Sequence, residues 1–207
     1  MSKPLLKIGI LISGRGSNMA SIIEACAKCE LPAEIACVIS NKADAKGLEI
    51  AQANNIPTIV ISHKDYKERQ SFEEAIEKAL VEHEVQLVCL AGFMRLLTSW
   101  FTERWRDRLI NIHPSLLPSF KGTETHKQVL EYGAKITGCT VHFVRAEMDH
   151  GPIIVQRAVL ILEDDTEETL AQRVLQEEHK AYVEAIKMIA NNRVNVIDER
   201  VFITSMD

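Results

Sequence analysis

Five short apolar runs recur along the first half of the chain, and they are nearly continuous rather than alternating. Such runs are typical of parallel strands that are covered on both faces. Amphipathic helical patterns separate them, as in a doubly wound sheet. The predicted strands are 8–12, 35–39, 58–61, 87–91 and 109–112, and the predicted helices are 18–28, 47–54, 66–82 and 97–106.

The pattern changes after Pro118 and predicts a different edge of the sheet. A short helical pattern at 125–132 precedes two β-rich runs, 138–144 and 152–161, which the polar segment 145–151 separates. Two such runs joined by a short polar segment favour an antiparallel arrangement. We therefore expect an α/β fold, with an open, mostly parallel, twisted sheet, helices on both faces in a Rossmann-like manner, and an antiparallel C-terminal edge.

A long amphipathic pattern at 166–189 predicts the last helix, which we expect to pack across the sheet. It opens with a Thr-Glu-Glu-Thr sequence that suits a helix cap. The segment 196–203 then predicts a terminal strand. No internal repeat or linker divides the chain, and 207 residues suffice to bury one large core, with room at most for a small appendage.

Composition and charge narrow the functional classes. The net charge of -5 disfavours non-specific binding of nucleic acid, because the phosphates are repelled. The five cysteines are an odd number, and three lie in apolar strand-like runs, as reduced core thiols do. The first apolar run leads directly into a glycine loop without a cleavage site, and no uncharged stretch approaches the ~20 residues of a membrane helix. We expect a soluble, cytoplasmic protein that binds neither nucleic acid nor membrane.

A Ser-Gly-Arg-Gly-Ser-Asn loop joins the first strand to the first helix. Its residues Gly16, Ser17 and Asn18 stand where backbone amides and the positive end of the helix can hold a phosphate. Met19 occupies the third glycine position of a dinucleotide fingerprint, and no acid closes the second strand. A monophosphate therefore fits better than the dinucleotide of an oxidoreductase, and an ordinary tight turn without a ligand is the alternative.

Asn111 and His113 end the fifth predicted strand on one face, at the edge where open α/β sheets bind ligands. Asp149 lies in the polar turn between the two late β-rich runs. From there it could fix the tautomer of the imidazole and raise its pKa. A structural histidine and an aspartate that caps its own turn are the alternatives. A non-catalytic ligand-binding module would leave these residues without a chemical role.

Three segments carry a resemblance to a known family: 13–18, 111–122 and 141–154. In sequence they read SGRGSN, NIHPSLLPSFKG and VHFVRAEMDHGPII, and they resemble the folate-dependent phosphoribosylglycinamide formyltransferases. The Asn-x-His-Pro-Ser-Leu-Leu-Pro core is shared with methionyl-tRNA formyltransferases and formyltetrahydrofolate deformylases. Those enzymes carry an additional C-terminal or N-terminal domain, for which we expect no room in this chain.

The resemblance implies transfer of a formyl group from the co-substrate 10-formyltetrahydrofolate to glycinamide ribonucleotide, by a monomer or homodimer without a metal. It implies one formyltransferase domain, 1–207, with a phosphate-binding half of about 1–105 and a folate and catalytic half of about 106–207. It makes Asn111, His113 and Asp149 catalytic, assigns the phosphate to Gly16, Ser17 and Asn18, and assigns the ribonucleotide to Glu178. It assigns folate contacts to Arg69, Met94, Arg95, Leu96, Leu97, Asn111, Arg145, Ala146, Glu147, Met148 and Asp149.

One residue departs from the pattern of the resembled family, and one cysteine pair could suggest a metal site instead. Many members of the resembled family have a histidine where this chain has Glu124, which puts a secondary contact in doubt. Cys26 and Cys29 are spaced like half of a zinc site, but no second pair follows at ligand spacing. The sequence therefore predicts no metal.

Overall fold

The structure is a computed structural model that describes residues 4–205. A seven-stranded sheet has the order β3-β2-β1-β4-β5-β6-β7, and β8 and β9 form a separate two-stranded sheet. The strands from β1 to β5 pair in parallel, whereas β6 and β7 add to the sheet in antiparallel fashion. The predicted fold class is confirmed. The expected domain 1–207 includes residues 1–3 and 206–207, which lie outside the described residues.

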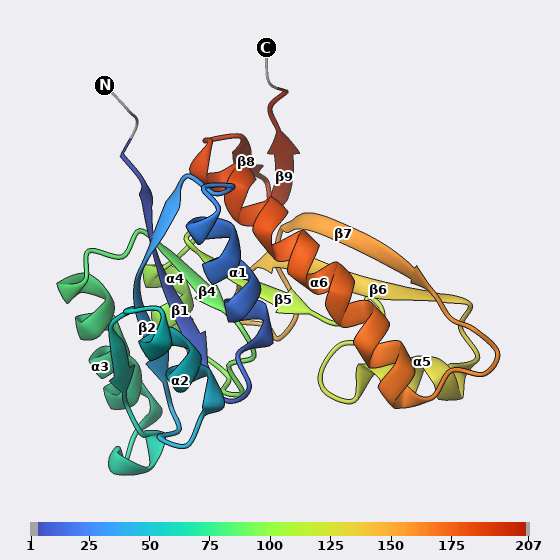
Figure 1. Cartoon of the computed structure of the whole chain (residues 1–207), viewed down its shortest axis with the longest axis horizontal. Helices are drawn as coiled ribbons and strands as arrows, with labels where there is room; N and C mark the ends of the chain where they lie inside the picture. The colour runs from blue at the N-terminus through green and yellow to red at the C-terminus, as the bar shows by residue number, and fades with distance from the viewer. Residues whose placement is uncertain (1–3, 206–207) are drawn as a thin grey trace.

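The elements follow the chain as Figure 1 labels them. The strands are β1 Leu6–Ile12, β2 Ala33–Ser40, β3 Thr58–Val60, β4 Leu87–Leu90, β5 Leu109–His113, β6 Ile136–Phe143, β7 Ile153–Leu160, β8 Val194–Ile197 and β9 Arg200–Ile203. The helices are α1 Ser17–Ala27, α2 Lys46–Ala53, α3 Arg69–Glu82, α4 Ser99–Arg104, α5 Thr125–Tyr132 and α6 Glu167–Ala190, with a 3-10 turn at His63–Asp65.

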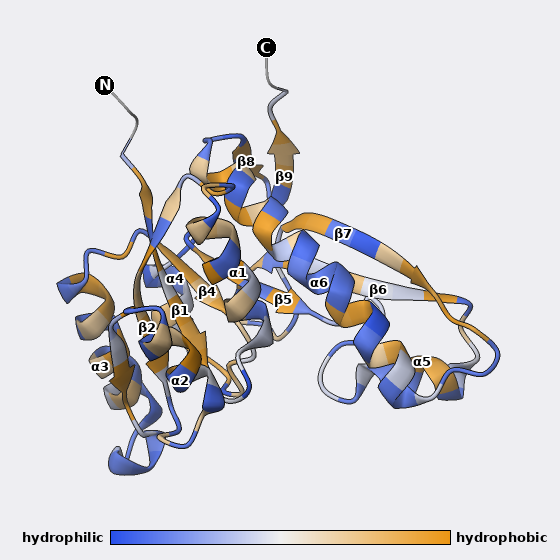
Figure 2. Ribbon diagram, viewed as in Figure 1, coloured by the Kyte–Doolittle hydropathy of each residue, from blue (hydrophilic) through white to orange (hydrophobic). Residues whose placement is uncertain are grey.

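The sheet separates two apolar cores, one on each face. Ile10 and Ile12 of β1 join the core that contains buried residues of α1, α2 and α6. Leu11, between them, joins the core beneath α3 and α4. Successive side chains of a strand point to opposite faces, so a strand covered on both sides must be apolar at every position. Figure 2 shows the result, with apolar strands at the centre and helices that carry both polar and apolar residues.

The long helix α6 is fastened at its start and along its buried face. The Thr166 hydroxyl accepts from the Thr169 amide at 3.2 Å, and the Thr169 hydroxyl accepts from the Thr166 amide at 2.9 Å. This reciprocal cap confirms the predicted helix start. The fully buried Tyr182 donates its hydroxyl to the carbonyl of Leu90 at 2.9 Å. Because Leu90 ends β4, this bond fixes α6 across the centre of the sheet.

The C-terminal segment differs from its prediction. Instead of one strand at 196–203, the chain forms the β8–β9 hairpin. Asp198 and Glu199 connect the two strands with φ angles of 49° and 57°. Two consecutive residues with positive φ make the tight turn whose twist matches a hairpin. The apolar pattern of the segment correctly predicted β structure. The turn within it was missed because it contains neither glycine nor asparagine, the residues that usually indicate a hairpin turn.

Two helices also start later than predicted, and the cysteine prediction holds. α3 begins at Arg69 rather than at residue 66, and α4 at Ser99 rather than at residue 97. All five cysteines are free thiols, and Cys37, Cys89 and Cys139 are buried. Among residues 4–205, no helix has the length and apolarity needed to cross a membrane.

Candidate functional site

The glycine loop ends β1 at the point where the sheet order reverses. β1 lies between β2 and β4, so the connections on either side of it diverge there, as at ligand sites of other open α/β sheets. Gly16 precedes α1 with φ of 73° and offers no side-chain cap, which leaves the first amides of the helix without that partner. A Cβ on Gly16 would lie 2.9 Å from the Cα of Gly47. The loop thus depends on glycine, and its helix end suits an anion.

Asn18 and Glu178 meet although 160 residues separate them. The Asn18 amide donates from Nδ2 to Glu178 Oε2 at 2.7 Å, and both side chains are buried. Burial raises the pKa of Glu178, against which the bond from Asn18 acts. The buried Oδ1 of Asn18 has no protein partner. The first turn of α1 and the middle of α6 therefore present polar groups at one place.

His113 and Asp149 are brought together as predicted. His113 Nδ1 lies 3.4 Å from Asp149 Oδ1, and both side chains are largely buried. The other carboxylate oxygen of Asp149 accepts from the Gly122 amide at 2.7 Å. Asp149 has φ of 49°, which places it in the left-handed region within its turn. The turn that follows Pro114 thus supplies the group that orients the acid.

Both nitrogens of the His113 ring face acceptors. Nε2 lies 2.9 Å from the carbonyl oxygen of Phe120, and a carbonyl can only accept. The ring must therefore donate from Nε2, while Nδ1 faces the carboxylate of Asp149. The ring is thus held between a backbone carbonyl on one side and a carboxylate on the other. Asn111 precedes His113 by two residues, is half-buried, and has no side-chain hydrogen bond within residues 4–205. Its amide is free to donate to a ligand.

The segment assigned to folate lies beside the end of β1. Met94 and Leu96 are exposed at 70% and 57%, large values for apolar side chains, and Arg95 and Leu97 are half-buried. Arg69 is exposed at the start of α3. One turn later, Glu73 accepts from the amide of Thr98 at 2.8 Å. This bond fastens α3 to the residue that follows the segment 94–97.

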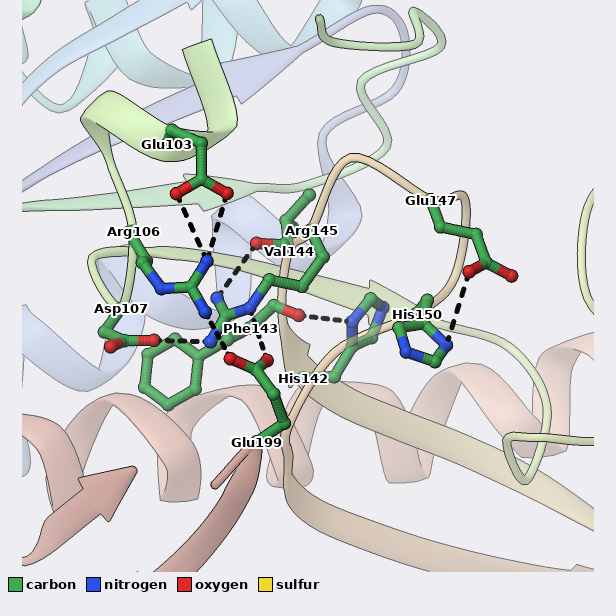
Figure 3. A network of polar contacts seen from close by, with 10 residues as sticks. All are labelled: Glu103, Arg106, Asp107, His142, Phe143, Val144, Arg145, Glu147, His150 and Glu199. Atoms are coloured by element: carbon green, nitrogen blue, oxygen red, sulfur yellow. Dashed lines mark hydrogen bonds and ion pairs between the residues drawn. The ribbon is translucent and has the colours of Figure 1, made fainter. Parts of the chain in front are cut away.

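The loop 144–151 contains both exposed residues and residues whose side chains are held by ion pairs. Ala146, Glu147 and Met148 are exposed. The Arg145 guanidinium instead pairs with Asp107 and Glu199, and Figure 3 shows it between these carboxylates. The structure therefore groups Asp149 with His113 but turns the Arg145 side chain toward α4 and the C-terminal hairpin.

No cluster of three or more histidine, cysteine or acidic side chains suited to a metal occurs within the described residues. Of the cysteine pair on the first helix, Cys26 is half-buried and Cys29 is exposed. Burial raises the pKa of the Cys26 thiol to about 11, which disfavours the thiolate that a metal would need.

Residues 6–186 match the model of the formyl transferase family. The chain belongs to this family. It is 41% identical over 197 residues to the phosphoribosylglycinamide formyltransferase of Haemophilus influenzae, covering 95% of this chain and 93% of that protein. It superposes with a TM-score of 0.96 and 44% identity on the crystal structure of glycinamide ribonucleotide transformylase 1 from Symbiobacterium toebii, covering 99% and 96% of the two chains.

A longer relative is the trifunctional purine biosynthetic protein adenosine-3 of Gallus gallus, which is 49% identical over 191 residues. The match covers 92% of this formyl transferase but only 19% of the length of the trifunctional protein. The family resemblance that the three sequence segments suggested is thus confirmed.

The sequence reasoning missed a serine that holds two parts of this formyl transferase together. Ser13, which follows β1, donates its hydroxyl to Asn41 Oδ1 at 2.6 Å and accepts from the Met94 amide at 2.8 Å. Its own amide donates to the Gly92 carbonyl at 3.1 Å. Ser13 therefore links the glycine loop to the segment 94–97. Polar residues that end β1 and β2 were the available signal.

His142 is a second residue near the site that no sequence motif singles out. It is buried next to the catalytic candidates, and its Nδ1 donates to the Phe143 carbonyl at 2.9 Å, while the buried Nε2 has no partner. Burial lowers its pKa to about 4. His142 is therefore neutral at physiological pH, beside a His113 ring that faces two acceptors.

Proposed function

We propose that this chain transfers the formyl group of 10-formyltetrahydrofolate to the amine of glycinamide ribonucleotide, yielding formylglycinamide ribonucleotide and tetrahydrofolate in de novo purine synthesis. The observation that carries the proposal is the contact of His113 with Asp149, on the strand that also carries Asn111, in a chain that is 41% identical over 95% of its length to a phosphoribosylglycinamide formyltransferase. We further propose a cytoplasmic enzyme, monomeric or homodimeric, and its five free cysteines agree with a reducing compartment.

The ribonucleotide site is proposed at the start of α1. The phosphate would be held by the backbone of Gly16, Ser17 and Asn18, where the helix dipole is positive. The nearby side-chain oxygen of Asn18, Oδ1, has no protein partner, and the side-chain amide of Asn18 donates to Glu178. An acceptor oxygen and a carboxylate at one place suit the hydroxyl or amine groups of a substrate that also carries a phosphate.

The folate site is proposed between the segment 94–97 and the loop 145–149. Met94 and Leu96 offer exposed apolar surface, and Arg95, Leu97 and Arg69 complete that side. Ala146, Glu147 and Met148 offer the opposite side, with Asn111 and Asp149 at the reacting end. Because the Arg145 side chain is engaged elsewhere, its contribution to folate would come from its backbone.

The chemistry requires one bond to form and one to break. The neutral amine attacks the formyl carbon, negative charge develops on the formyl oxygen, and the bond from this carbon to the folate nitrogen then breaks. Asn111 would donate to the oxyanion, an interaction worth about 10²–10³ in rate. The amine loses a proton and the folate nitrogen gains one, and His113 held by Asp149 would assist this transfer, for about 10²–10⁴ in rate.

The position of the imidazole sets a condition on this mechanism. One nitrogen of His113 faces Asp149 and the other donates to the Phe120 carbonyl. Donation to a substrate oxygen therefore requires that the substrate or an ordered water replace the Phe120 contact. The contact to Asp149 can persist throughout, which keeps the ring oriented and compensates its positive charge.

The deciding experiment follows the absorbance of a formyl-folate donor with purified protein, with and without glycinamide ribonucleotide, and with His113→Ala as the control. Folate release that requires the acceptor and disappears in the variant is the expected result. Release without an acceptor would identify a deformylase. Saturable binding of a nicotinamide cofactor without formyl transfer would favour an oxidoreductase, and folate binding that His113→Ala leaves without functional loss would favour a binding module.

A further inference from the structure

The loop that carries Asp149 has a narrow base. The Phe143 amide donates to the Pro152 carbonyl at 2.9 Å, which closes the loop between β6 and β7. Gly151 packs so tightly at this base that an added Cβ would lie 2.0 Å from the Phe143 carbonyl oxygen and 3.2 Å from the Arg145 Cγ. The stem of Arg145 therefore lies across the base of the loop, against the residue where the loop ends.

The head of Arg145 is held outside the loop by two acids. Its guanidinium donates to Asp107 Oδ1 at 2.7 Å and to Glu199 Oε2 at 2.6 Å, and the Arg145 side chain is only 9% exposed. Burial opposes the charge on Arg145, but its two partners more than offset this, so its pKa is raised. Figure 3 shows that these contacts join the loop, the segment that follows α4 and the C-terminal hairpin.

Glu199 reaches Arg145 from a remote part of the chain. It lies in the turn between β8 and β9, and the bond from Arg145 lowers its pKa and keeps it charged. Its other oxygen contacts Arg106, which in turn donates to Glu103 at 3.0 Å. The β8–β9 hairpin lies beyond residues 6–186, the range that matches the family model. We call the pairing of Arg145 with Glu199 the clamp; its carboxylate comes from a segment that the family model does not match.

The tip of the loop rests on the turn that also contacts His113. Asp149 accepts from the Gly122 amide, and Glu147 lies 3.6 Å from Lys121 Nζ. These two contacts hold the tip, whereas Arg145 holds the base four residues earlier. A loop fixed at both ends has little freedom, so the clamp on Arg145 limits where the exposed residues 146–148 can lie.

We infer that Glu199 is a positioning residue for the formyl-folate site: by holding Arg145, the C-terminal hairpin sets the position of the loop 144–151 against the co-substrate. This inference rests on the proposed function. Glu199 touches neither the catalytic candidates nor the glycine loop in any contact within residues 4–205, so its influence should be confined to the folate side of the reaction.

The test compares the steady-state kinetics of Glu199→Ala, Glu199→Gln and the control Arg106→Gln with those of the wild type. For Glu199→Ala we expect the KM for formyl-folate to rise about fivefold, as for the loss of one well-placed ion pair, with an unchanged KM for glycinamide ribonucleotide. Glu199→Gln keeps an acceptor for the Arg145 Nε–H and should recover most of the folate KM. Arg106→Gln removes the other contact of Glu199 and should behave as wild type.

Amide hydrogen exchange separates a failure of this inference from a failure of the proposed function. In Glu199→Ala, amides of residues 144–151 should exchange faster, while those of β1 and β4 exchange as in the wild type, whether or not the protein transfers formyl groups. A folded variant with wild-type exchange in the loop and a wild-type folate KM would overturn the inference, and so would equal increases in both KM values. If the wild type transfers no formyl group but the loop still loosens, the proposed function fails and the clamp stands.

Discussion

At the residue scale, the catalytic candidates depend on backbone partners as much as on one another. The Phe120 carbonyl orients His113, and the Gly122 amide orients Asp149, so one turn after β5 serves both side chains. Such supporting bonds restrict the rotation of the reacting groups, which lets the charge develop in a prepared environment. The distance from His113 to Asp149 is 3.4 Å, slightly longer than an ideal charged hydrogen bond.

The role of the acid predicts the behaviour of Asp149→Asn. The asparagine oxygen can still accept from the Gly122 amide, and asparagine tolerates the left-handed backbone, so substrate binding should be retained. The variant lacks the charge that compensates the imidazolium, and we expect kcat to fall about 10²- to 10⁴-fold with little change in either KM. Steady-state kinetics check this, and wild-type turnover would refute the pairing.

Buried His142 predicts a specific dependence of stability on pH. Its pKa of about 4 in the folded protein lies below the ordinary value of 6.5, so the unfolded chain binds more protons between these values. Stability from this group is therefore present above pH 6.5 and is lost as the pH falls toward 4, by on the order of 3 kcal/mol. In denaturant titrations, His142→Gln should lose stability less steeply than the wild type across this window. Parallel curves for the two proteins would contradict the prediction.

At the scale of elements, the start of α1 determines where an anion can bind. The loop has two glycines with different demands. Gly16 has φ of 73° and packs against the backbone of Gly47, whereas a Cβ on Gly14 would meet nothing within 4 Å. The strand end, the glycine contact and the helix start thus form one rigid unit.

This difference gives a matched pair of variants. Gly16→Ala should lower the free energy of unfolding by about 1–3 kcal/mol, from backbone strain and the clash with Gly47, and should raise the KM for the ribonucleotide at least about tenfold. Gly14→Ala should change stability by less than about 0.5 kcal/mol. Thermal melts and steady-state kinetics check both variants, and equal behaviour of the two would show that the loop geometry does not govern phosphate binding.

At the scale of the whole molecule, the two proposed halves share one sheet. The boundary near residue 105 falls between β4 and β5, which are hydrogen-bonded neighbours. Asn18 binds Glu178 across this boundary, and Tyr182 of α6 binds the end of β4. Contacts of this kind make separate unfolding of the halves unfavourable, because each would expose its side of a common core.

We therefore predict that the chain unfolds as one cooperative unit. The fluorescence of Trp100 and Trp105, both on the α3 and α4 face, should change at the same denaturant concentration as the far-ultraviolet circular dichroism, within about 0.2 M. Amides of β6 and β7 should share the slowest exchange with those of β1 and β4. Two separated transitions would instead show that the halves are independent domains.

Patterns within one element were sufficient to predict much of the fold. Continuous apolar runs predicted the parallel strands because a strand that is buried on both faces needs an apolar residue at nearly every position. The Thr-Glu-Glu-Thr cap predicted the start of α6 because its two bonds lie within four residues. The hairpin turn at Asp198 and Glu199 escaped prediction because Glu199 stands where such a turn usually has a glycine.

The sequence by itself determined the fold class, the glycine loop and the identities of Asn111, His113 and Asp149, because periodicity, caps and family segments are local properties of the chain. Only the tertiary structure decided that Asp149 faces His113, that Glu178 binds Asn18, and that Arg145 turns toward Glu199. These contacts join residues 36, 160 and 54 positions apart. The separation of two residues along the chain does not tell whether they are close in space. Such contacts form only when strands pair and helices cover them.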